Sequence, residues 1–302
     1  MKLALKIDVD TYRGTRDGVP RLLELLVRHR ARATFLFSLG PDHTGRAIRR
    51  IFRPGFARKV SRTSVVSHYG LTTLLYGTLL PGPDIGRRCA DVMRKVRDEG
   101  FEVGIHTYDH VEWQDRVGRA SREWTHREMR LACDRFEEVF GEPARVHGAA
   151  GWQMNLHAYR LEPELGFHFC SDTRGSRPFI PVSNNESIPC PQLPTTLPTL
   201  DELIGTDGLT LDNVSHHLLR MTEKPSPTGH VYTLHAELEG NKLAGVFEQL
   251  LVGWRTQGYA LVSLREYANG FDLPRLPRHV VTEGSLPGRS GTVAMQGPEF
   301  QA

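Results

Sequence analysis

Residues 3–10 read Leu-Ala-Leu-Lys-Ile-Asp-Val-Asp, an apolar run that ends in two carboxylates. A short run of this kind is typical of a strand buried in a sheet. The segment 19–30 that follows carries leucines at the spacing of an amphipathic helix. A strand followed by a helix is the repeating unit of a parallel sheet, so this stretch indicates the fold class.

The same alternation continues along the chain. Further strands are predicted at 33–39, 101–106, 145–149, 167–171, 187–193, 230–235 and 259–264, and further helices at 84–99, from Thr125 onward, and at 243–257. This pattern predicts an α/β fold, a distorted and nearly closed (βα) barrel with about seven strands. Residues 271–302 are rich in Pro, Gly, Ser and Arg without apolar periodicity, so we expect a barrel domain over 1–270 and a disordered tail.

Composition limits the classes of partner and compartment. The net charge of +3 gives no global field that would require nucleic acid as a partner. The first residues place a charge every few positions, unlike a signal peptide, and no stretch reaches the ~18 apolar residues of a membrane-spanning helix. The cysteines have no Cys-x-x-Cys spacing and indicate core residues in a reducing compartment. We therefore expect a cytoplasmic protein.

One segment, residues 42–83, is far longer than the roughly two to six residues usual between a strand and a helix. It carries seven basic and no acidic residues from Arg46 to Arg62, and then the apolar stretch 71–80. A solvated basic face followed by an ordinary packed helix is one interpretation. We favour an interfacial segment that binds anionic lipid headgroups at a membrane surface. The candidate headgroup-binding residues are Arg49, Arg50, Arg53, Arg58 and Lys59.

Three motifs carry candidate chemistry, each at the end of a predicted strand. Asp8 and Asp10 are two residues apart and so share one face of a strand, where two close carboxylates need a cation or hydrogen bonds. His106 and His110 are four apart, the spacing at which one helical turn places two imidazoles on one side. His235 ends a third strand. Because parallel strands end at one edge of a barrel, the motifs predict a metal bound by a carboxylate and two imidazoles.

These motifs resemble the polysaccharide deacetylase family, and the resemblance extends to about residue 268. It implies that Asp8 is the general base, that Asp10, His106 and His110 hold one divalent metal, and that His235 is the general acid. Zn²⁺ suits these ligands, and Co²⁺ or Mn²⁺ could serve. The reaction implied is hydrolysis of an amide on a sugar.

Four further stretches, 8–20, 148–152, 171–175 and 235–240, resemble one subfamily, the deformylases that act on undecaprenyl-phosphate-linked 4-deoxy-4-formamido-L-arabinose. That resemblance implies a polyprenyl-phosphate-linked substrate, a peripheral location on the inner face of the bacterial inner membrane, and a role in the lipid A modification that confers polymyxin resistance. The family's usual Arg-x-Pro-x-Gly motif is replaced here by His147-Gly-Ala-Ala-Gly-Trp152. Candidates for oxyanion binding or for orienting the catalytic groups are Gly148, Ala149, Gly151, Trp152, Asp172 and Arg174.

Three alternatives remain open at this point. The substrate could be another N-acyl sugar, such as peptidoglycan or a chitooligosaccharide, although those enzymes usually act outside the cell. Two imidazoles and a carboxylate also serve non-haem iron oxygenases, but Asp8 and His235 are then unexplained. A non-catalytic, metal-stabilised lipid-binding module is the third.

Overall fold

The structure, a computed structural model, describes residues 1–47, 73–289 and 291–301. A seven-stranded parallel sheet forms its centre, in the order β5-β4-β3-β2-β1-β8, with β9 pairing the beginning of β1. The strands are β1 (Lys2–Val9), β2 (Thr34–Ser38), β3 (Glu102–Thr107), β4 (Val146–His147), β5 (Phe169–Cys170), β8 (His230–His235) and β9 (Ala260–Val262). The predicted α/β class and strand number are confirmed.

An irregular segment, residues 191–196, joins the two edges of this sheet. On one side, the Leu193 N–H donates to the Cys170 carbonyl of β5 at 2.7 Å. On the other, the Thr196 N–H donates to the Val231 carbonyl of β8 at 3.0 Å. The predicted strand at 187–193 is therefore mostly this connection. It makes the sheet a nearly closed and distorted barrel.

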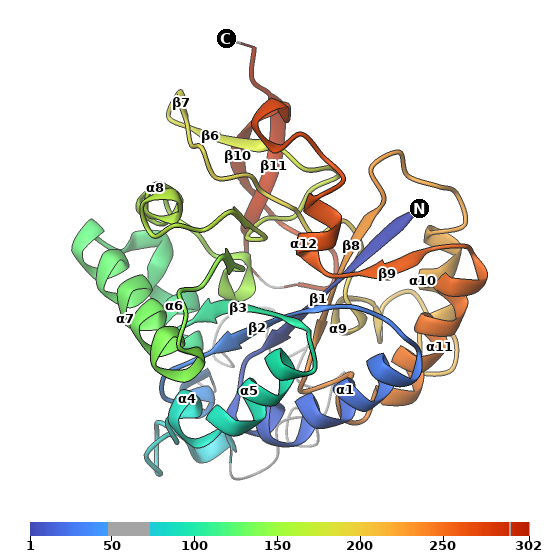
Figure 1. The fold of residues 1–302 in the computed structure, drawn as a ribbon, viewed down its shortest axis with the longest axis horizontal. Helices are drawn as coiled ribbons and strands as arrows, with labels where there is room; N and C mark the ends of the chain where they lie inside the picture. The colour runs from blue at the N-terminus through green and yellow to red at the C-terminus, as the bar shows by residue number, and fades with distance from the viewer. Residues whose placement is uncertain (48–72, 290, 302) are drawn as a thin grey trace.

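Helices cover the outer face of the barrel, with α7, α5, α1 and α11 following one another around the sheet (Figure 1). The α-helices are α1 (Val19–Arg28), α4 (Ile85–Arg88), α5 (Ala90–Asp98), α6 (His110–Arg116), α7 (Arg122–Phe140), α8 (Leu156–Glu164), α9 (Leu200–Leu203), α10 (Val214–Met221), α11 (Ala244–Thr256) and α12 (Leu264–Ala268). Short 3₁₀ or π turns are η1 (Gly14–Gly18), η3 (Thr73–Leu75), η4 (Val117–Arg119), η5 (Ala150–Trp152) and η6 (Leu273–Arg275). Within the described ranges, no helix is long and apolar enough to cross a membrane.

Strand β1 separates the two parts of the core. Its odd-numbered residues from Leu3 to Val9 pack in the larger apolar cluster beneath the helices, whereas Ala4 belongs to a smaller cluster with residues of β2, β4, β5 and β8. Because side chains alternate along a strand, Lys6 and Asp8 point the same way as Ala4. Both are buried. A lysine and an aspartate thus replace apolar residues inside the barrel.

Two helix predictions need correction. The predicted helix at 84–99 is two helices, α4 and α5, with a break at Cys89. Helix α7 begins at Arg122, one turn before Thr125, because the Ser121 side chain accepts a hydrogen bond from the Trp124 N–H at 3.3 Å. The Thr125 hydroxyl donates to the Ser121 carbonyl at 3.0 Å and so lies inside the first turn.

The prediction of a disordered tail is wrong. Residues of the tail form an antiparallel hairpin of β10 (Arg278–Gly284) and β11 (Val293–Glu299), which extends a second sheet through β6 (Ile180–Ser183) to β7 (Glu186–Ser187). This sheet stands opposite α4, α5 and α1 (Figure 1). The hairpin's partners lie about a hundred residues earlier in the chain, so local periodicity carried no sign of it.

The predicted lipid-binding residues Arg49, Arg50, Arg53, Arg58 and Lys59 lie outside the described residues. The two ends of the 42–83 segment are described, and they meet. The Asp42 N–H donates to the Pro83 carbonyl at 2.9 Å, and the Gly45 N–H donates to the Tyr76 carbonyl at 3.0 Å.

Candidate metal and catalytic centre

The five residues predicted to form the centre come together at the carboxyl end of the barrel. Asp8 lies near the end of β1 and is the register partner of His235, the last residue of β8. His106 lies near the end of β3. Asp10 follows β1, and His110 opens helix α6. Three parallel strands therefore deliver these side chains to one edge of the sheet.

Asp10, His106 and His110 offer ligand atoms that all lie within 4.8 Å of one another. The Asp10 Oδ1 is 3.2 Å from the His106 Nε2, and the Asp10 Oδ2 is 3.4 Å from the His110 Nε2. Asp10 Oδ1 is buried without a hydrogen-bond partner in the described part of the chain, as expected of an atom that binds an ion. A carboxylate and two imidazoles of this spacing fit a divalent metal.

The charge state of Asp10 also favours a cation. Burial alone would raise the pKa of this carboxyl, but the neighbouring His110 and His106 outweigh burial and hold its pKa well below the usual range. Asp10 therefore stays ionised at neutral pH.

The two imidazoles are held in place by different means. The His106 Nδ1 donates to the Gly148 carbonyl at 2.6 Å, which leaves Nε2 as the ligand atom. His110 is fixed by the start of α6, where the Asp109 side chain accepts from the Val111 and Glu112 N–H groups. The sequence prediction placed both histidines on one helical turn. The structure instead has one on a strand and one on a helix, joined by a capped turn.

Glu237 organises the loop that carries Asp10, and sequence reasoning missed it. Its Oε1 accepts three hydrogen bonds, from the Asp10 N–H (3.0 Å), the Thr11 N–H (2.8 Å) and the Thr11 hydroxyl (2.8 Å). Gly14 permits this approach, because a Cβ there would lie 1.9 Å from the same oxygen. The position of Glu237, two residues beyond His235 at a strand end, was the available signal.

Lys6 is the second residue that was missed. Its Nζ lies 3.5 Å from the Asp8 Oδ2 and donates to the Ser171 carbonyl at 2.9 Å. Asp8 is also 3.7 Å from the His106 ring, measured from its Oδ1 to the Nδ1. A lysine at even spacing from Asp8 inside an apolar strand was the signal that could have identified it. Lys6 thus supplies the cation beside the candidate base.

Asp172 and Arg174, which were predicted to orient the catalytic groups, pair with other side chains. Asp172 accepts from the Ala149 N–H at 2.7 Å and lies 2.8 Å from the His147 Nδ1. Arg174 donates to both carboxylate oxygens of Glu202, at 2.8 and 3.0 Å. Both residues support the centre indirectly, one through the turn at 148–152 and the other through α9.

Three backbone amides of the turn at 148–152 already donate hydrogen bonds. The Gly148 N–H donates to the Ile105 carbonyl, the Ala149 N–H to Asp172, and the Trp152 N–H to the Ala149 carbonyl. These three amides are occupied and do not serve as oxyanion donors. Gly151 is the candidate that these bonds do not exclude.

His235 lies among carboxylates. Its Nδ1 is 3.9 Å from the Asp201 Oδ1, and its backbone N–H donates to the Glu239 Oε2 at 3.0 Å. Burial would lower the pKa of His235, but Asp201, Asp10 and Glu239 outweigh it and raise the pKa to about 9. The imidazole is therefore protonated at neutral pH, the state of a general acid.

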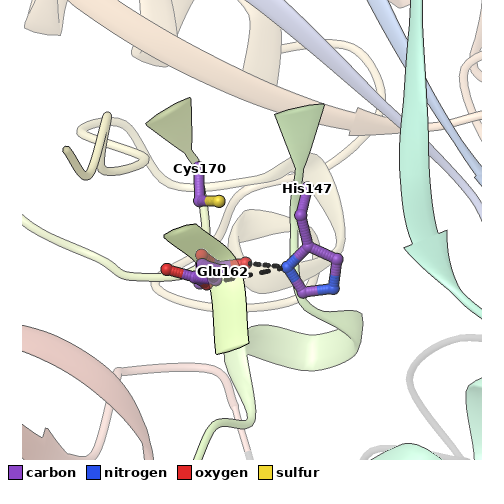
Figure 2. A group of neighbouring side chains, drawn as sticks. His147, Glu162 and Cys170 are labelled. Carbon is purple, nitrogen blue, oxygen red and sulfur yellow. Dashed lines mark ion pairs between the residues drawn. The ribbon is translucent and has the colours of Figure 1, made fainter. Parts of the chain in front are cut away.

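A second buried group of titratable residues lies behind β4 and β5. His147, Glu162, Cys170 and Asp172 offer ligand atoms within 4.8 Å of one another, and Figure 2 shows Glu162 directed at the His147 ring. Burial, together with Asp172, raises the pKa of Glu162 well above its usual range, whereas His147 outweighs burial and lowers the pKa of Asp172 to about 2. Glu162 can thus keep its proton and stay neutral, while the ionised Asp172 pairs with His147. The group fixes the Ala149 turn through Asp172.

Comparisons with known proteins identify the family of the chain. The profile of the family described as polysaccharide deacetylase matches residues 3–169, more than half of the chain. A protein of Shewanella sediminis named "Probable 4-deoxy-4-formamido-L-arabinose-phosphoundecaprenol deformylase" is 36% identical over 296 residues, 98% of this chain and 94% of the relative. A protein of the same name from Wigglesworthia glossinidia brevipalpis is 31% identical over 284 residues, 94% of this chain and 98% of the relative.

Solved structures share the fold. The crystal structure of a protein described as a polysaccharide deacetylase from Mycobacterium smegmatis superposes with a TM-score of 0.63, at 17% identity, and 94% of each chain is covered. A pseudoenzyme of carbohydrate esterase family 4 from Bacillus anthracis gives a TM-score of 0.51 at 14% identity, with 92% of this chain and 69% of that chain covered.

Proposed function

The chain belongs to the polysaccharide deacetylase family, and from that premise we propose that it hydrolyses 4-deoxy-4-formamido-L-arabinose-phosphoundecaprenol to formate and the amino-sugar lipid. The predicted amide hydrolase is confirmed at the level of this family. The observation that carries the substrate is the 36% identity to a relative of that name, over nearly the full length of both chains. The similarity to relatives named as deformylases favours this hydrolase over an iron oxygenase or a non-catalytic module.

In this proposal Asp10, His106 and His110 hold one divalent metal. The unpartnered Asp10 oxygen and the ionised state of its carboxyl support the assignment. A bound metal supplies Lewis acidity, which polarises a carbonyl oxygen and lowers the pKa of water. Zn²⁺ suits two imidazoles and a carboxylate, and Co²⁺ and Mn²⁺ are the alternatives.

The proton transfers fall to Asp8 and His235. Asp8 accepts a proton from the water that attacks the formyl carbon, and Lys6 balances its negative charge. His235 donates a proton to the sugar nitrogen as the C–N bond breaks, because an amine anion is too poor a leaving group at neutral pH. The products are formate and the free amine. The raised pKa of His235 supports the second role.

Mass spectrometry of the lipid-linked sugar tests this function. We expect loss of the formyl group from the formamido substrate, no loss after treatment with a chelator, and recovery when Zn²⁺ is returned. The N-acetyl analogue on the same lipid carrier is the comparison. Faster release of acetate than of formate would replace this proposal with a deacetylase.

We also propose that the protein meets its lipid substrate at the cytoplasmic face of the inner membrane. Near the end of the 42–83 segment, Leu75, Leu79 and Leu80 are exposed, and Leu79 is 81% exposed. Gly77, in the same turn, lies against His43, which contacts Asp109 at the start of α6, so this turn lies on the side of the barrel that carries His110. Apolar side chains in such a position fit insertion below lipid headgroups.

Co-sedimentation with vesicles of anionic phospholipid tests the membrane contact. Leu79→Ser should weaken sedimentation, because it removes an exposed apolar side chain from the contact. Leu211→Ser is the matched control, since Leu211 is 51% exposed outside this segment. Equal sedimentation of both variants and the wild type would contradict the assignment.

A further inference from the structure

The loop between β10 and β11 brings Arg289 against the centre. Its Nη2 donates to the Gly151 carbonyl at 3.2 Å, and its guanidinium stacks on Trp152 at 4.7 Å from the ring centroid. Gly288 allows this approach. It has a φ of +77°, and a Cβ there would lie 2.2 Å from the Glu202 carbonyl oxygen. The loop is therefore built against α9 and the 148–152 turn.

Two guanidinium groups meet at the Trp152 ring, and the carboxylates of Asp201, Glu202 and Asp10 face Arg289. Arg174 also stacks on Trp152, at 4.9 Å, and binds both carboxylate oxygens of Glu202. Glu202 is 3.8 Å from the Arg289 Nη1, beyond hydrogen-bond distance. Glu202 therefore hydrogen-bonds to Arg174 and leaves Arg289 without a hydrogen bond from this carboxylate.

Most N–H donors of the Arg289 guanidinium make no hydrogen bond within the described residues. A guanidinium carries five N–H donors. In the described part of the chain, the hydrogen bond to the Gly151 carbonyl is the one that this guanidinium makes. Its side chain keeps 15% of its surface exposed, although burial is the main cause that lowers the pKa of its guanidinium. A planar guanidinium whose remaining N–H donors are not hydrogen-bonded to a carboxylate is suited to binding a phosphate through two parallel hydrogen bonds.

The position of Arg289 relative to the metal ligands indicates which part of the substrate it would bind. The turn whose Gly151 carbonyl accepts from Arg289 also holds His106, through the Gly148 carbonyl. On the other side, the Asp201 next to Glu202 faces His235. Arg289 therefore lies at the rim of the candidate centre, between the elements that position a metal ligand and the candidate acid.

We propose that Arg289 binds the phosphodiester of the lipid-linked substrate. This inference rests on the proposed function, in which the formamide at C4 of the sugar reaches the metal ligands. The phosphate at C1 is at the opposite end of the pyranose ring and so remains toward the rim. Arg289 then discriminates a polyprenyl-phosphate-linked sugar from a neutral glycoside.

Kinetics on two substrates test this role. One is the lipid-linked phosphodiester, and the other is the neutral octyl glycoside of the same formamido sugar. Arg289→Gln should lower kcat/KM on the phosphodiester about 10- to 100-fold, through KM, the effect of losing a charged hydrogen bond. It should lower kcat/KM on the octyl glycoside by a much smaller factor. Arg275→Gln, a change at an 86% exposed arginine of the same tail, should leave both unchanged.

Two outcomes would overturn the inference. Equal losses on both substrates would give Arg289 a structural role, and no loss on the phosphodiester would remove its role altogether. Arg289→Lys keeps the charge and should retain part of the preference for the phosphodiester, so it separates lost charge from misfolding.

Binding of dodecyl phosphate, measured by calorimetry, separates this inference from the proposed function. If the wild type binds dodecyl phosphate more tightly than Arg289→Gln but releases no formate, the function fails and the phosphate site stands. If the wild type releases formate but both proteins bind dodecyl phosphate equally, the function stands and the phosphate site fails.

Discussion

Replacing Lys6 by Met tests whether the barrel interior depends on a charge pair. Lys6 and Asp8 are both buried, and the Lys6 Nζ is 3.5 Å from the Asp8 Oδ2. At an effective dielectric constant of about 20, two unit charges at that distance attract by about 5 kcal/mol. Met has a similar length and no charge, so the variant leaves Asp8 buried without its partner. Removing one partner of a buried pair costs about 3–5 kcal/mol.

The assay is urea unfolding of chelator-treated protein, which keeps a metal from taking over the role of Lys6. We expect the free energy of unfolding to fall by about 3–5 kcal/mol in Lys6→Met. Lys2→Met is the control on the same strand, because Lys2 is partly exposed, and its cost should stay below about 1 kcal/mol.

A double-mutant cycle isolates the pair. Asp8→Asn removes the charge that Lys6→Met leaves behind, so the double variant should lose less stability than the sum of the single variants, by about 1–3 kcal/mol. Lys6→Met also loses the hydrogen bond to the Ser171 carbonyl, but this loss is the same whether or not Asp8 is replaced, so it cancels in the cycle. Strict additivity would refute the reasoning and reduce Lys6 to a space-filling side chain.

The remaining predictions concern the centre itself. Asp10→Ala should lose the bound metal and all formate release, checked by metal analysis and mass spectrometry; full metal content would contradict the ligand set. His235→Ala should lower kcat by about 10²–10⁴-fold, and wild-type kcat should fall as pH rises through about 9, where the imidazole loses its proton. Since the pKa of His235 in the folded protein is raised above the usual 6.5 of a histidine, the stability due to His235 is present below about pH 6.5 and is lost as the pH passes about 9. A flat profile to higher pH would argue against this acid. Gly14→Ala should push Glu237 away and abolish activity, whereas Gly118→Ala, with open space around it, should be neutral; equal activity would exclude a role for the Glu237 contact.

Local patterns were enough for much of the fold. The apolar run of β1 and the leucine spacing of α1 gave the strand and the helix directly. Repetition of that unit implied a parallel sheet, because parallel strands need a crossover. Errors arose where stability comes from distant contacts, as in the tail hairpin, whose β10 pairs with β6.

The candidate centre was predictable for a related reason. A strand end can be identified locally, and parallel strands end at one edge, so residues at three strand ends could be expected to meet. The conformation between His106 and His110 was misjudged, because the spacing of four fits a helix as well as a strand end followed by a capped turn.

The sequence by itself determined which residues stand at the ends of the strands, since periodicity and turn residues are properties of neighbouring positions. The tertiary structure decided which residues support them. Glu237 reaches the Asp10 loop across 227 positions, and Arg289 reaches Gly151 across 138. Such pairs leave no local pattern, because their energy comes from burial and charge that exist only once distant segments pack together.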